Sequence, residues 1–68
     1  MNDKLYTIPE VASYLKISKS KVYWLVQTHK IPHVRIGRNV RIREQDLEKW
    51  LNLQLVGVID RALEMKRQ

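Results

Sequence analysis

With 68 residues, the chain is long enough for one small domain, near the lower limit at which a hydrophobic core alone maintains a fold. The absence of cysteine excludes disulfides and thiolate metal sites. No apolar run approaches the roughly 20 residues that cross a bilayer, so we expect a cytoplasmic protein without a membrane partner. The net charge of +6 at pH 7 indicates a polyanionic partner.

The basic residues are concentrated in one part of the chain. Residues 11–43 contain no Asp or Glu. A surface that serves only solubility mixes the two signs of charge, so this segregation favours a nucleic-acid partner. The cations of this part are Lys16, Lys19, Lys21, Lys30, Arg35, Arg38, Arg41 and Arg43.

A first helix is predicted to begin at Thr7. The Thr7 hydroxyl can accept from the Glu10 amide while the Glu10 carboxylate reaches back, which is a capping box, and Pro9 loses no needed donor in the first turn. An apolar stripe of helical spacing follows and should face the core. It consists of Val11, Ala12 and Leu15 and continues into Ile17.

Ser18 is the predicted N-cap of a second helix, which starts shortly after the first one ends. So short a connection is typical of a helix-turn-helix motif. The segment His29-Lys30-Ile31-Pro32 should end the second helix, because a proline disfavours helical angles at the preceding residue. Helical spacing directs three apolar side chains toward the core: Val22, Leu25 and Val26. The outer face then consists of Lys19, Ser20, Tyr23, Trp24 and Gln27.

Residues 34–43 alternate between apolar and cationic side chains, which predicts a β-hairpin. Gly37, Arg38 and Asn39 form the predicted turn, since Gly and Asn tolerate positive φ. We expect one apolar face packed on the helices and one cationic face. The apolar set is Val34, Ile36, Val40 and Ile42, and the cationic set is Arg35, Arg41 and Arg43.

A third helix is predicted from Glu44, because Glu44, Asp46 and Glu48 suit the positive N-terminal end of a helix. Its inner face should consist of Leu47, Trp50 and Leu51. The expected fold class is therefore mainly α with a small β-hairpin, arranged as a winged helix-turn-helix.

Residues 1–51 form the predicted DNA-binding domain, and residues 52–68 form a C-terminal helical extension. The extension is either one long helix with what precedes it or two helices, because Gly57 lies inside it. Its apolar stripe is too wide for a helix left free in water. It either completes the core or contacts a second copy of the chain or a partner protein. The residues assigned to such a contact are Leu55, Val58, Ile59 and Ala62.

No catalytic or metal site is predicted. His29 and His33 have a spacing that suits zinc only on a continuous helix, and Pro32 interrupts it. No activated nucleophile, Gly-rich phosphate loop or paired carboxylates can be assembled from the sequence. We therefore expect a protein that is not an enzyme and needs no cofactor.

Several segments occur together in a specific order and spacing. They are YTIPEVA at residues 6–12, LKISKSKVY at 15–23, Ile31-Pro32, VRIGRNVRI at 34–42 and DLEKWL at 46–51. In these segments the chain resembles the excisionase family of small DNA-binding proteins, whose domain is a MerR-like winged helix-turn-helix. Lys16 stands where the family often has Gly, and Trp24 stands where it often has Arg.

The resemblance implies a non-enzymatic protein that binds duplex DNA and helps a separate integrase or recombinase excise a mobile element. It places the protein in a bacterial or phage context, associated with DNA in the cytoplasm. Self-association, through the extension or cooperatively on DNA, is a further expectation. Close relatives act as transcriptional repressors or activators.

Sites on DNA follow from this arrangement. The outer face of the second helix is expected to contact base edges in the major groove through Lys19, Ser20, Tyr23, Trp24 and Gln27. The hairpin is expected to enter the minor groove or clamp the backbone through Arg35, Arg38, Asn39 and Arg41. Backbone contacts are expected from Thr7, Ser18, Lys21, Lys30 and Arg43. As an alternative, Arg43 pairs with an acidic residue of the third helix.

Three functions are open at this point. The first is an excisionase-type architectural factor, and the second is a small transcriptional regulator of the same fold. The third is a protein-interaction module that docks an integrase or a toxin and has an incidental basic face. Phosphate contacts make affinity fall steeply with salt concentration, so a salt series separates the third function from the other two.

Overall fold

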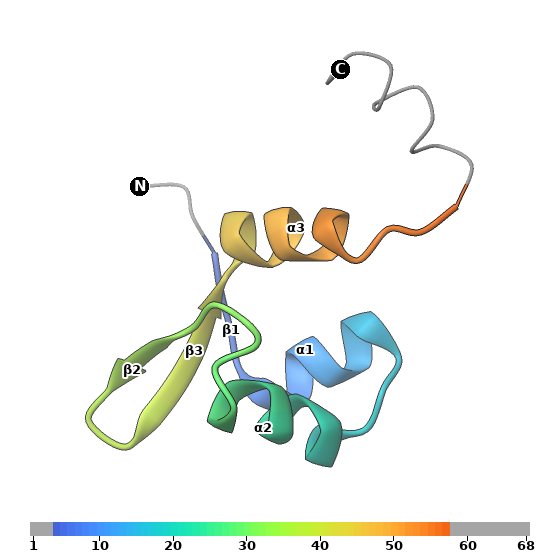
Figure 1. Cartoon of the computed structure of the whole chain (residues 1–68). Helices are drawn as coiled ribbons and strands as arrows, with labels where there is room; N and C mark the ends of the chain where they lie inside the picture. The colour runs from blue at the N-terminus through green and yellow to red at the C-terminus, as the bar shows by residue number, and fades with distance from the viewer. Residues whose placement is uncertain (1–3, 58–68) are drawn as a thin grey trace.

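The computed structural model describes residues 4–57. This part of the chain is mainly helical, with a small antiparallel sheet in the strand order β1-β3-β2 (Figure 1). The elements are β1 (Leu5–Tyr6), α1 (Ile8–Leu15), α2 (Lys19–Gln27), β2 (Val34–Ile36), β3 (Asn39–Arg43) and α3 (Glu44–Leu53). The β2–β3 hairpin projects from the helices as a wing, so the winged helix-turn-helix predicted from the sequence is confirmed.

The start of α1 is the predicted capping box. The Glu10 amide donates to Thr7 Oγ1 over 3.3 Å, and the Thr7 amide donates to Glu10 Oε1 over 2.9 Å. Two amides that have no partner within the helix are thereby satisfied. β1 precedes this cap directly and pairs with β3, so the capping box fixes α1 against the sheet.

The turn between α1 and α2 depends on a left-handed residue. Lys16 has φ 60° and ψ 44°, and its amide donates to the carbonyl of Ala12. The amide of Ile17 donates to the same carbonyl over 3.1 Å. Ser18 then caps α2 by accepting from the Lys21 amide over 3.0 Å, as predicted. A lysine thus occupies a conformation that glycine adopts without steric cost.

α2 ends at Gln27 with Thr28 as its C-cap, directly before the segment 29–32 that was predicted to end it. His29 has a positive φ of 57°. Its amide donates to the carbonyl of Val26, and the Lys30 amide donates to that of Leu25. These two bonds form a Schellman motif, which satisfies the last carbonyls of the helix before the proline is reached.

The hairpin turn is shorter than the sequence pattern predicted. Ile36 pairs with Asn39, so Gly37 and Arg38 alone form the turn and Asn39 is the first residue of β3. Gly37 has a φ of 61°, and Arg38 is not among the residues with positive φ. Positive φ at only the first turn position is the pattern of a type II′ turn, which matches the twist of the strands.

This register mixes the two predicted faces of the hairpin. Residues directly opposite each other in antiparallel strands share a face, so Arg35 lies on the same face as its partner Val40 and as Ile42. Ile36 lies on the other face and is 57% exposed. Changing the turn by one residue moves every side chain of a strand to the opposite face. The prediction of one apolar and one cationic face is therefore wrong.

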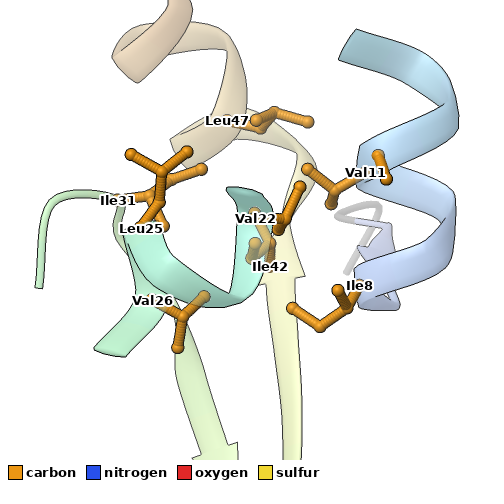
Figure 2. Close-up of a cluster of buried hydrophobic side chains, with 9 residues drawn as sticks. Ile8, Val11, Val22, Leu25, Val26, Ile31, Ile42 and Leu47 are labelled. Atoms are coloured by element: carbon orange, nitrogen blue, oxygen red, sulfur yellow. The ribbon is translucent and has the colours of Figure 1, made fainter. Parts of the chain in front are cut away.

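The core draws on every helix and on the central strand. Figure 2 shows its side chains converging between α1, α2, β3 and α3. The buried set is Ile8, Val11, Ala12, Val22, Leu25, Val26, Ile31, Ile42 and Leu47. The predicted inner residues Leu15 and Trp50 are partly buried and pack against this core, whereas Ile17 and Leu51 are exposed.

The described part of the predicted extension is exposed. α3 ends at Leu53, with Gln54 as its C-cap, and residues 54–57 are not helical. Leu55 is exposed. Val58, Ile59 and Ala62 lie outside the described residues. None of the helices described is long and apolar enough to cross a membrane.

Candidate nucleic-acid interface

The outer face of α2 is exposed as its helical phase predicted. Val22, Leu25 and Val26 anchor the helix in the core, which fixes the direction of the remaining side chains. The five residues expected in the major groove are all exposed: Lys19, Ser20, Tyr23, Trp24 and Gln27. Their contact with bases remains a prediction.

The two neighbouring aromatic residues of α2 have different surroundings. Tyr23 lines a cleft of about 170 Å³ between the start of α1 and the wing. Trp24 instead lies beside two lysines: Lys21 Nζ is 4.8 Å from the centroid of the indole ring, and Lys30 Nζ is 5.9 Å from it. The outer face of α2 therefore divides into a wing side and a lysine side.

The cleft joins residues that are distant in the sequence. It is lined by Thr7, Ile8, Pro9, Tyr23, Arg38, Asn39, Val40 and Arg41. Three wing residues predicted to bind DNA thus meet one predicted groove residue and one predicted backbone contact. None of the lining residues is acidic, so the charge of the cleft is positive. Ile8 and Pro9 were not predicted to take part, because only the folded domain brings the start of α1 beside the wing.

The arginines of the wing differ in their exposure and in their contacts. Arg35 and Arg38 are exposed. Arg41 is half-buried and donates from Nη1 to the carbonyl of Val40 over 2.8 Å. Arg43 forms an ion pair with Asp46 of α3, with 2.7 Å between Nε and Oδ2. The pairing of Arg43 with an acidic residue of the third helix, stated above as an alternative, is thus present. Arg35 and Arg38 lie nearest the tip and are exposed.

The remaining predicted backbone contacts lie at helix ends. The oxygens of Thr7 and Ser18 each accept an amide of their own helix, which leaves the hydroxyl protons free to donate to a phosphate. Lys21 is in the first turn of α2, and Lys30 follows its end. All four except the half-buried Thr7 are exposed.

The histidines beside Lys30 stack on each other. The ring centroids of His29 and His33 are 6.0 Å apart, and the ring planes differ by 20°. His33 Nδ1 lies 2.9 Å from the carbonyl oxygen of Ile31. Within residues 4–57, no group of at least three His, Cys, Asp or Glu side chains is placed to hold a metal ion.

Acidic side chains gather at a different place on the domain. A small cleft of about 80 Å³ is lined by Tyr6, Tyr14, Glu44, Leu47 and Glu48. The Tyr6 hydroxyl donates to Glu44 Oε2 over 3.3 Å, and its ring stacks on Tyr14 with 6.4 Å between centroids. Burial, and next the negative charge of Glu44, raise the pKa of the Tyr6 phenol. The carboxylates of early α3 are thus kept apart from the cleft at the wing.

Comparison with known proteins gives a consistent result. A family model described as a helix-turn-helix domain matches residues 5–54. An excisionase from Streptomyces ambofaciens is 33% identical over 52 residues, which cover 76% of this chain and 84% of that protein. No solved structure matched the chain.

Two further relatives share only a part of their length. "Uncharacterized protein YvgK" of Bacillus subtilis is 47% identical over 45 residues, or 66% of this chain and 15% of that protein. "Putative DNA-binding protein MT0521" of Mycobacterium tuberculosis is 38% identical over 48 residues, or 71% of this chain and 62% of that protein. The residues that match the family model, 5–54, contain α1, α2 and the wing, and the chain belongs to the excisionase-type helix-turn-helix family of DNA-binding domains.

Proposed function

We propose that the protein binds duplex DNA through the outer face of α2 and the β2–β3 wing. The observation that carries this proposal is the cleft that Tyr23 of α2, Arg38 and Arg41 of the wing, and the start of α1 line together, because no acidic residue is part of its lining. A duplex presents a groove flanked by two phosphate backbones, and a helix beside a cationic hairpin can contact both at once.

The charge of the domain supports the same orientation. The exposed cations Lys19, Lys21 and Lys30 lie on or next to α2, and Arg35 and Arg38 lie on the wing. Residues 11–43 contribute no negative charge to oppose a phosphate. The acidic side chains Asp46 and Glu44 are engaged with Arg43 and Tyr6 respectively. The field over α2 and the wing therefore favours a polyanion.

Titration of a labelled duplex with the protein across a salt series tests this proposal. Each phosphate neutralised adds about 0.9 to the slope of log affinity against log salt. Arg38→Ala should weaken binding to every sequence and reduce the slope by about that amount. Lys49→Ala removes one exposed charge from α3 and should leave the slope unchanged. Binding by the unchanged protein that shows no salt dependence would contradict the proposal.

We further propose that the protein acts as an excisionase-type architectural factor at a recombination site. Its similarity to a protein named excisionase, over most of that protein's length, supports this role. A DNase footprint on the DNA that flanks the gene should then cover short direct repeats beside a recombination site. Protection of a promoter instead would assign the chain to transcriptional regulation.

A further inference from the structure

We infer that Trp24 is a positioning residue that holds Lys21 and Lys30 as a clamp on the phosphate backbone of the DNA, rather than a reader of bases. This inference rests on the proposed binding of duplex DNA. The geometry behind it is the placement of two ammonium groups over one indole ring, at 4.8 Å and 5.9 Å from its centroid.

The ring attracts both ammonium groups and restricts them. A tryptophan face attracts a cation within about 6 Å of its centroid, and both lysines meet that criterion. A free lysine loses considerable side-chain entropy when it is immobilised on a phosphate. Lysines already held over Trp24 have lost part of that freedom before DNA arrives, so the loss on binding is smaller.

Hydrogen bonds fix the main chain of Trp24 and of Lys30 relative to each other. The carbonyl of Trp24 accepts from the Thr28 amide over 3.0 Å and from Thr28 Oγ1 over 2.7 Å. The Lys30 amide donates to the carbonyl of Leu25 over 2.8 Å, and the Lys30 carbonyl accepts from Trp50 Nε1 over 2.7 Å. Residues of α2 and α3 therefore lock the end of the helix where Lys30 leaves it.

Among the described residues, no carboxylate forms an ion pair with either ammonium group. Like charges that share one ring repel each other, and phosphate anions near both of them reduce that repulsion. A lysine ammonium is a compact point charge that suits a phosphate oxygen. A ring already covered by two cations has less free face for stacking on a base. Trp24 is 47% exposed, so a phosphate can still approach the cluster.

A double-mutant cycle on duplex DNA tests the clamp. Trp24→Leu removes no charge, yet it should weaken binding about three- to tenfold on every sequence, because two lysines lose their preorganisation. Lys21→Gln and Lys30→Gln should each cost less affinity in the Trp24→Leu background than in the unchanged protein. Trp24→Phe keeps an aromatic face and should restore part of the affinity. Tyr23→Leu, the matched aromatic control in the other half of the face, should show no coupling to either lysine.

Other outcomes overturn the inference. Additive effects of the tryptophan and lysine substitutions would show that the ring does not position the lysines. A changed sequence preference in Trp24→Leu without such coupling would make Trp24 a base reader.

A measurement without DNA separates the clamp from the proposed function. In the free protein, the ε-methylene protons of Lys21 and Lys30 should show upfield ring-current shifts that disappear in Trp24→Leu. If these shifts are present but the protein does not bind DNA, the proposed function fails while the cluster itself is real. If the shifts are missing while binding is normal, the clamp alone is wrong.

Discussion

α2 and the β2–β3 wing carry most of the predicted DNA contacts, but the domain holds them in different ways. α2 buries Val22, Leu25 and Val26 and is capped at both ends by hydrogen bonds. The wing has one fully buried residue, Ile42, and its tip at Gly37 and Arg38 projects beyond the helices (Figure 1). The helix is thus fixed by packing, whereas the tip of the wing is fixed by its turn and strand pairing.

The difference shows how far a side-chain pattern determines a surface. In a helix the period of 3.6 residues is a property of the backbone, so the outer face of α2 could be assigned from spacing alone. In a hairpin the face of each residue depends on the register, and the register depends on the turn. Arg35 and Ile36 consequently lie on the opposite faces from those that their alternation suggested.

Substitutions at two isoleucines of the hairpin should give the largest difference in the free energy of unfolding. Ile42→Ala should lower the free energy of unfolding by about 2–5 kcal/mol, because it opens a cavity between the helices and the sheet. Ile36→Ala should change it by less than about 0.5 kcal/mol, since Ile36 is 57% exposed. Urea denaturation of both variants measures the difference. Equal destabilisation would mean that the wing packs through both faces.

A substitution in the turn before α2 should instead raise the stability of the domain. Lys16→Gly should raise the free energy of unfolding by about 0.5–1 kcal/mol, because glycine removes the steric cost of φ 60° while it loses more entropy on folding. Lys49→Gly, the control within α3, should lower it by about 1 kcal/mol. Thermal melts of both variants provide the measurement. A loss of stability in Lys16→Gly would contradict left-handed strain at this turn.

The smallest expected effect concerns alkaline pH. The phenol pKa of Tyr6 is raised in the folded protein, so its contribution to stability is fully present below about pH 10, the ordinary tyrosine value. It is lost as the pH rises from there through the higher folded pKa, because the unfolded chain releases this proton more readily. Between pH 8 and pH 11, two values on either side of about 10, the Tyr6→Phe variant should therefore lose less stability than the unchanged protein. An identical loss, measured by urea denaturation, would show that Tyr6 does not contribute.

Much of the fold could be predicted because helix caps depend on residues that are close together in the sequence. The capping box at Thr7 and the N-cap at Ser18 have side chains that reach only a few residues, so both were confirmed. Lys16, at the turn position where the family often has glycine, has positive φ. The end of α2 was predicted from Pro32, whereas the left-handed conformation of His29 ends the helix before the proline is reached.

The sequence by itself determined the helices, their inner faces and the segregation of charge, because these depend on periodicity and on neighbours along the chain. Only the tertiary structure decided the register of the wing, the cleft that joins Tyr23 to Arg38 and Arg41, and the grouping of Lys21 and Lys30 around Trp24. The cleft in particular joins residues 7–9, 23 and 38–41 through strand pairing and packing across the domain. It depends on contacts between distant parts of the chain, which no local pattern records.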